Sequence, residues 1–335
     1  MKRVLAALAA VALASGLAAC GSSSDDSSAS GSSSSSDSST TASSGGKDYT
    51  IGVANFTLGA PYFIAMSRAI QDEGSRAGVD VKVTDAGSDA TKLTTDVQNL
   101  IDQKVDGIVI SGGPLEAAPA ALNAAKQANI PVVMVDRRLK GGDYASWIGP
   151  DNLAIGRQAG EYIERRLSGD GTVGIIKGGP ADNTIGLDRT NGMLSVLRAD
   201  PGIRTVAAPD FGNWATDGGV QVAENMLAKN DDIDAIFCEN DAMCLGAQKA
   251  ARDAGRSDDL FLVSADGQKE VLKAILDGTN YGATGANDAN KIGRMGYQRL
   301  VDILGGQQAE KDTVVPAPEI TKDNVEQYYD PNSLF

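Results

Sequence analysis

The residues best suited to chemistry in this 335-residue chain are acids, amides and arginines that directly follow short apolar runs. In the clearest case, residues 130–137, the run Ile-Pro-Val-Val-Met-Val is followed by Asp136 and Arg137. Four further runs end in the same manner, at Ser111, Lys177, Asn240 and Asp266. Histidine is absent, which excludes Ser-His-Asp and Cys-His catalysis and imidazole metal ligands. The pattern therefore favours binding over catalysis.

The apolar runs predict strands of a parallel sheet that is buried on both faces. Unbroken β-branched residues suit such strands, and Pro131 is tolerated at the start of one. Segments with helical periodicity lie between the runs, among them 61–77 and 152–167. This alternation predicts a doubly wound α/β fold whose ligand lies beyond the carboxyl ends of the strands. Because the pattern begins again near Thr172, we expect two such lobes with a cleft between them.

The first 47 residues have the composition of an export and anchoring segment. Residues 1–19 form a secretory signal, with two basic residues and an apolar run too short to span a membrane. Their ending, Leu-Ala-Ala before Cys20, resembles the lipobox of bacterial lipoproteins. We therefore expect a lipid on Cys20 at the outer face of the cytoplasmic membrane; the alternative is an ordinary cleaved signal. Residues 20–47 are expected to be a disordered, serine-rich tether.

Charge and cysteine usage exclude several other classes of function. The formal net charge is −14, or −16 without Lys2 and Arg3, which argues against binding to nucleic acid or to anionic lipid. Cys238 and Cys244 do not have the spacing of a zinc site. In an exported protein they could form a disulfide, but we expect two buried thiols and leave the disulfide open. We predict no metal and no cofactor.

Several phrases resemble the ribose-binding family of periplasmic sugar-binding proteins, from Asp48 to about Asn324. They lie at residues 58–63, 129–137, 149–152, 239–247 and 264–267. The resemblance implies a monomer whose two lobes, joined by three hinge strands, close on one sugar and deliver it to an ABC permease and its ATPase. The first lobe would comprise residues 48–150 and 288–316, and the second residues 151–287 and 317–335.

The resemblance also implies a set of sugar-binding residues. They are Tyr62, Phe63, Ser111, Asp136, Arg137, Asn183, Arg189, Trp214, Asn240, Asp266 and Asn287. Phe211 could replace Trp214 as the aromatic residue of the second lobe, and Asp241 is expected to cap a helix rather than to bind ligand. The chemistry of these residues agrees with the resemblance. A sugar hydroxyl both donates and accepts, so carboxylates and guanidiniums together can hold a neutral polyol.

Three departures from the ribose pattern predict a differently shaped pocket. Ala60, Ala265 and Asn287 are smaller than the residues that the family often has at these positions. A pentose, a hexose or a cyclic polyol would each fit this description. A sensory binding protein that reports to a membrane receptor or kinase stays an open alternative to a transport protein. A repressor is set aside because the chain begins with a signal peptide, and an enzyme is disfavoured because a catalytic constellation is missing.

Overall fold

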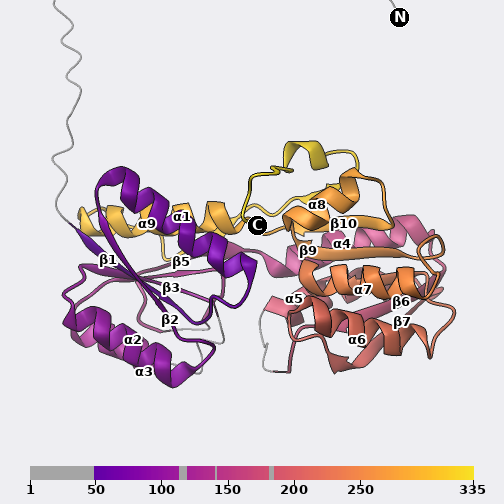
Figure 1. Cartoon of the computed structure of the whole chain (residues 1–335), viewed down its shortest axis with the longest axis horizontal. Helices are drawn as coiled ribbons and strands as arrows, with labels where there is room; N and C mark the ends of the chain where they lie inside the picture. Colours follow the sequence, from indigo (N-terminus) through magenta and orange to yellow (C-terminus); the bar gives the residue numbers. More distant parts are fainter. Residues whose placement is uncertain (1–48, 113–118, 140–141, 181–184) are drawn as a thin grey trace, which may run out of the picture. The chain divides into compact units, whose positions relative to one another are not determined.

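Two six-stranded sheets form the framework of the protein (Figure 1). The computed structural model describes residues 49–112, 119–139, 142–180 and 185–335, and the chain from Gly46 onward is one compact unit. The predicted signal segment, Cys20, the tether and Asn183 lie outside the described residues. Within these ranges, no helix combines the length and apolarity that a membrane-spanning segment needs.

The first sheet has the strand order β11-β5-β4-β3-β1-β2, and all neighbouring strands are parallel. Its strands are β1 (Thr50–Asn55), β2 (Asp80–Asp85), β3 (Gly107–Ser111), β4 (Val132–Val135), β5 (Ser146–Pro150) and β11 (Asp312–Val315). Helices α1 (Pro61–Ala77) and α9 (Ala289–Leu304) cover one face, and α2 (Ala90–Asp102) and α3 (Pro119–Gln127) cover the other. We call this sheet and its helices the first lobe.

Strand β4 shows why its sequence is apolar without interruption. Val133 and Val135 pack into the core under α1 and α9, whereas Val132 and Met134 pack into the core under α2 and α3. Successive side chains of a strand point to opposite faces, so a strand covered on both faces needs an apolar residue at every position.

The second sheet has the strand order β12-β10-β9-β8-β6-β7, which repeats the pattern of the first. Its strands are β6 (Gly171–Lys177), β7 (Ile203–Phe211), β8 (Ala235–Cys238), β9 (Phe261–Asp266), β10 (Tyr281–Ala286) and the antiparallel β12 (Glu319–Thr321). Helices α4 (Asn152–Leu167) and α5 (Ile185–Leu197) cover one face; α6 (Thr216–Leu227), α7 (Asp241–Asp253), α8 (Lys269–Leu276) and the short η2 (Val325–Gln327) cover the other. The predicted fold of two doubly wound lobes is confirmed.

The start of α7 differs from the prediction by one residue. Asn240, not Asp241, is the N-cap, and its Oδ1 accepts a hydrogen bond of 3.0 Å from the Met243 amide. Asp241 is the first helical residue and is fully buried, with its carboxylate bonded to groups of β9 and β10. The expectation of a capping Asp241 is therefore wrong, because the tertiary contacts of its carboxylate take precedence over local capping.

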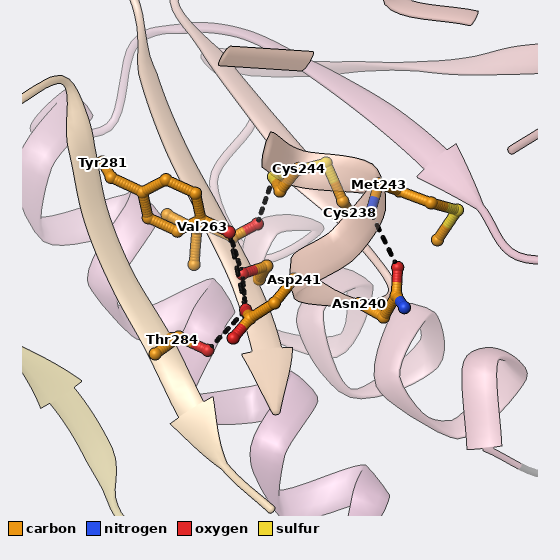
Figure 2. The surroundings of a disulfide bond; sticks show 9 residues. Cys238, Asn240, Asp241, Met243, Cys244, Val263, Tyr281 and Thr284 are labelled. Carbon is orange, nitrogen blue, oxygen red and sulfur yellow. Dashed lines mark hydrogen bonds between the residues drawn. A yellow bond between two sulfur atoms is a disulfide. The ribbon is translucent and has the colours of Figure 1, made fainter. Parts of the chain in front are cut away.

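The two cysteines of the second lobe form a disulfide (Figure 2). Cys238 ends β8 and Cys244 lies in the second turn of α7, and their Cα atoms are 5.4 Å apart. Both residues are buried, as expected, but the preferred expectation of two free thiols is wrong and the alternative is right. The strand and the helix that follows it bring the two side chains together within six residues.

The last residues of the chain contact both lobes. Strand β12 and Val325 belong to the second lobe. Phe335, however, packs in the core of the first lobe, where its ring meets Tyr62 edge-on at a centroid distance of 5.2 Å. Residues of the segment 317–335 thus pack in both cores, and the lobe boundaries stay a prediction.

Candidate functional site

A cavity of about 380 Å³ is lined by residues of both lobes. Nine of the eleven predicted binding residues line it: Tyr62, Phe63, Asp136, Arg137, Arg189, Trp214, Asn240, Asp266 and Asn287. Most of them follow the carboxyl end of a strand or begin the helix after it. The two sheets thus bring together residues that are up to 225 positions apart in sequence.

Asp136 directly follows β4 and is almost fully buried. Its Oδ1 lies 2.9 Å from the Tyr62 hydroxyl, and its carbonyl oxygen accepts a 3.2 Å hydrogen bond from the Trp147 indole. Burial raises the pKa of Asp136, while the positive charge of Arg137 and the hydrogen bond from Tyr62 act in the opposite direction. Both the backbone and the carboxylate of Asp136 are thus fixed in place by the first lobe.

Tyr62 connects Asp136 with Asn287, which lies between β10 of the second lobe and α9 of the first lobe. Its hydroxyl lies 2.9 Å from Asp136 Oδ1 and 3.0 Å from Asn287 Oδ1, so two acceptors compete for one hydrogen. Burial and the charge of Asp136 raise the pKa of Tyr62 well above 10.0, so the phenol is neutral. The Tyr62 ring belongs to the core of the first lobe, whereas the adjoining Phe63 ring is half-buried and lines the cavity.

Arg189 is the charged centre of the second lobe, with only 1% of its surface exposed. Its Nη1 lies 2.9 Å from Asp266 Oδ1 and 2.7 Å from the Glu239 carbonyl oxygen. Its Nε donates to Asn152 Oδ1 at 2.9 Å. Burial disfavours the charge, but Asp266 and Asp136 outweigh this and raise the pKa of Arg189. The guanidinium is therefore held in one orientation by three protein groups.

Asp266 and Asn287 complete a polar chain across the cavity floor. Asn287 Nδ2 lies 3.4 Å from Asp266 Oδ1. A series of polar contacts therefore runs along the cavity in the order Asp136, Tyr62, Asn287, Asp266 and Arg189. Burial raises the pKa of Asp266, against the charge of Arg189. The chain combines strong acceptors with strong donors, and these are the groups that a molecule rich in hydroxyls needs.

Trp214 supplies the large aromatic surface of the second lobe. It lies just before α6 and lines the cavity, whereas Phe211 ends β7 and does not. The Trp214 ring packs directly on Gly178, where a Cβ would lie 2.0 Å from Trp214 Cε2. Asn240 Nδ2 donates to the Trp214 carbonyl oxygen at 3.3 Å, so the N-cap of α7 also fixes the backbone of the tryptophan.

Five cavity-lining residues adopt positive φ angles, which are unfavourable for residues other than glycine. The φ values are 70° at Ser88, 69° at Asp136, 53° at Asn213, 59° at Trp214 and 132° at Asp266. Such conformations cost on the order of 1–3 kcal/mol each and persist only where the surroundings enforce them. Because these residues all line one cavity, the surrounding structure holds their side chains in place at a cost in backbone free energy.

One predicted residue, Ser111, is described but does not line the cavity. Ser111, at the end of β3, is fully buried, and its hydroxyl donates to Asn55 Oδ1 at 2.6 Å. It lies within the sheet, opposite its strand neighbour Asn55, and does not line the cavity. Asn183 falls outside the described residues.

Other cavity-lining residues were missed by the sequence prediction. They are Phe56, Thr57, Gly59, Ser88, Ile185, Asn213 and Ala215; Ala60, noted only as a departure, also lines the cavity. Phe56 and Thr57 directly follow β1, so the rule that found Asp136 could have found them too. Ser88 and Asn213 lie in loops and carry no sequence signal of this kind.

The family of the chain follows from comparison with known proteins. Residues 51–308 match the protein family described as periplasmic binding protein domain. The chain belongs to this family. Periplasmic binding proteins bind solutes and are not enzymes, which confirms the prediction made from the polar strand ends. Among the described residues, no group of three or more cysteine, aspartate or glutamate side chains could hold a metal ion.

The relatives of this periplasmic binding protein include sugar-binding and polyol-binding proteins. The ribose import binding protein of Bacillus subtilis is 31% identical over 270 residues, which cover 81% of this chain and 86% of the relative. The xylitol-binding protein of Mycolicibacterium smegmatis is 29% identical, with 82% and 78% covered. The predicted resemblance to ribose-binding proteins is thereby confirmed.

Solved structures show the same fold. An ABC transporter solute-binding protein from Mycobacterium smegmatis, with bound glycerol, superposes with a TM-score of 0.81 at 27% identity over 86% of this chain and 99% of that one. An ABC transporter solute-binding protein from Bacillus halodurans, with bound myo-inositol, has a TM-score of 0.77 at 25% identity over 84% and 97%.

Proposed function

We propose that this protein is an extracytoplasmic solute-binding lipoprotein that captures a neutral monosaccharide or cyclic polyol and delivers it to an ABC permease. The observation that carries the proposal is the polar chain from Asp136 to Arg189, which lies in one cavity with the rings of Phe63 and Trp214. Hydrogen bonds to charged groups contribute about 1.5–3 kcal/mol each, and aromatic faces cover the C–H surface of a sugar ring.

The names of the relatives support the same ligand class. Ribose and xylitol occur in the names of curated relatives, and myo-inositol is bound in a structure of the same fold. The cavity of about 380 Å³ is large enough for a pentose, a hexose or a cyclitol. Ala60 on its wall supports a roomier pocket than one built for ribose alone.

Binding by hinge closure follows from the division of the site between the lobes. Asp136 and Phe63 belong to the first lobe, and Arg189 and Trp214 to the second. A sugar that contacts both sets favours the conformation in which they are close together, by the difference of its affinity for the two states. We expect the radius of gyration from solution scattering to decrease with saturating sugar. An unchanged curve at proven saturation would contradict closure.

The deciding experiment is a thermal-shift screen with pentoses, hexoses and polyols, followed by calorimetry on Asp136→Ala. Loss of this acceptor should weaken binding by about 2–4 kcal/mol, because sugar hydroxyls are left unpaired in a closed cavity. The matched control is Asp143→Ala, which removes an exposed carboxylate of the same lobe that pairs with Lys126. If Asp136→Ala binds the sugar with wild-type affinity, Asp136 is not a ligand-binding residue.

The lipid anchor and the transport role have separate tests. Cys20→Ala should move the protein from the membrane fraction to the soluble fraction, and an unmodified Cys20 in the mature wild-type protein would contradict anchoring. Stimulation of a reconstituted permease and ATPase by the loaded protein would support transport. Ligand-dependent activation of a membrane receptor or kinase, without such stimulation, would support the sensory alternative.

A further inference from the structure

Glu239 lies behind the cavity and connects three elements of the second lobe. It directly follows β8, is 3% exposed and does not line the cavity. Its Oε2 accepts a 2.6 Å hydrogen bond from the Gly178 amide after β6, and its Oε1 accepts one of 2.6 Å from the Thr190 hydroxyl in α5. Its carbonyl oxygen accepts from Arg189 Nη1 at 2.7 Å. One buried residue thus holds both the guanidinium and the helix that carries it.

The same carboxylate fixes the position of Trp214. The indole packs on Gly178, whose amide is bonded to Glu239, and on Gly186, where a Cβ would lie 3.0 Å from Trp214 Cη2. That Cβ would also lie 2.3 Å from Glu239 Oε2. Part of the surface under the tryptophan therefore consists of two glycines that are in contact with Glu239, and the ring also packs against the core of the second lobe.

The disulfide restrains the segment in which Glu239 lies. Cys238 and Cys244 flank Glu239 and the cap residue Asn240, so the turn from β8 into α7 is closed by a covalent bond (Figure 2). Both cysteines are fully buried. The bond therefore limits the conformations that the backbone of Glu239 and Asn240 can adopt.

We propose that Glu239 is a positioning residue for the ligand site: it does not touch ligand, but it holds Arg189 and Trp214 in their binding orientations. The inference rests on the proposed function. It also predicts which substitutions are tolerated. A glutamine keeps an oxygen acceptor for the Gly178 amide, and its NH₂ group can donate to the Thr190 hydroxyl. An alanine leaves the buried amide of Gly178 without an acceptor.

The test compares Glu239→Ala and Glu239→Gln in the full chain. The matched control is Asp234→Ala, which removes a carboxylate that accepts a 2.7 Å hydrogen bond from the Thr172 amide at the opposite end of β8. Affinity is measured by calorimetry with D-ribose, D-allose, xylitol and myo-inositol as probes. We expect Glu239→Ala to weaken binding roughly 10- to 100-fold, and the other two variants to stay within about threefold of wild type.

A second readout follows the tryptophan directly. The chain has two tryptophans, Trp147 in the first lobe and Trp214, so 5-fluorotryptophan labelling gives two ¹⁹F signals, assigned with Trp214→Phe. Without sugar, Glu239→Ala should shift or broaden only the Trp214 signal. Glu239→Gln and Asp234→Ala should leave both signals in place. A purely structural role of Glu239 would lower stability without this selectivity.

Several results would overturn the proposal. One is that Glu239→Ala keeps wild-type affinity and an unchanged Trp214 signal. Another is that Asp234→Ala loses as much affinity as Glu239→Ala. If Glu239→Ala does not fold, Thr190→Val takes its place, since it removes only one partner of the carboxylate; an unchanged signal and affinity there would contradict positioning. If wild type binds none of the probes, the proposed function fails, while the ¹⁹F signal still decides whether Glu239 positions Trp214.

Discussion

Replacing Asp241 by asparagine should remove a pH dependence of folding stability that we expect in the wild-type protein between about pH 4 and pH 7. Asp241 is fully buried, and its Oδ2 accepts a 2.6 Å hydrogen bond from the Gln268 amide. Its Oδ1 accepts a hydrogen bond from Ser264 and another from Thr284, which Figure 2 shows beside Asp241. Burial, and secondly the negative charge of Asp266, raise the pKa of Asp241 from 3.8 to about 7.

The sign of the effect follows from which state holds the proton. Between pH 4 and pH 7 the native protein keeps a proton on Asp241 that the unfolded chain releases, so the free energy of unfolding falls as the pH rises. One such proton corresponds to a slope of about 1.4 kcal/mol per pH unit. Over the pH interval from 3.8 to about 7, the free energy of unfolding falls by roughly 4 kcal/mol in total. Above pH 7 the stabilisation by the proton on Asp241 is lost.

Urea unfolding of wild type and Asp241→Asn at pH 4.5, 5.5, 6.5 and 7.5 measures this slope. An asparagine can accept from the Gln268 amide and donate to the two hydroxyls, so it keeps the network without titrating. The difference in unfolding free energy between the two proteins should fall with pH and level off above 7. Asp143→Asn, at an exposed carboxylate paired with Lys126, should leave the slope unchanged. Equal slopes in wild type and Asp241→Asn would refute the reasoning.

Three further predictions concern packing and covalent restraint. Arg189→Ala should lower the free energy of unfolding by about 3–5 kcal/mol as well as abolish binding, since it leaves Asp266 buried without its cation; Arg189→Lys should lose less stability in the same urea titration. Cys238→Ala with Cys244→Ala should cost roughly 2 kcal/mol, from the entropy of a short loop, measured against wild type without reductant. Phe335→Ala should lower both the unfolding midpoint and, in calorimetry, the sugar affinity, because the Phe335 ring packs against Tyr62, which lines the cavity; unchanged affinity would contradict that support.

Local patterns in the sequence were sufficient to predict the elements and much of the site. The helices over Pro61–Ala77 and Asn152–Leu167 begin and end as the periodicity predicted, because capping and amphipathic spacing act within a few residues. Asp136 and Asp266 were found because parallel strands of one sheet end at the same edge. The family resemblance added Arg189, which lies inside α5 and which no strand rule would single out.

The tertiary structure alone decided which side chains at those positions reach the cavity. Ser111 ends a strand as Asp266 does, but its hydroxyl turns to Asn55 within the sheet, and only the pairing of β1 with β3 determines this. The disulfide, the packing of Phe335 on the first lobe and the bonds of Glu239 all join residues whose distance depends on how helices pack on sheets. A sequence determines local geometry through short-range energies, whereas side-chain direction and contacts between elements arise only when the whole core is packed.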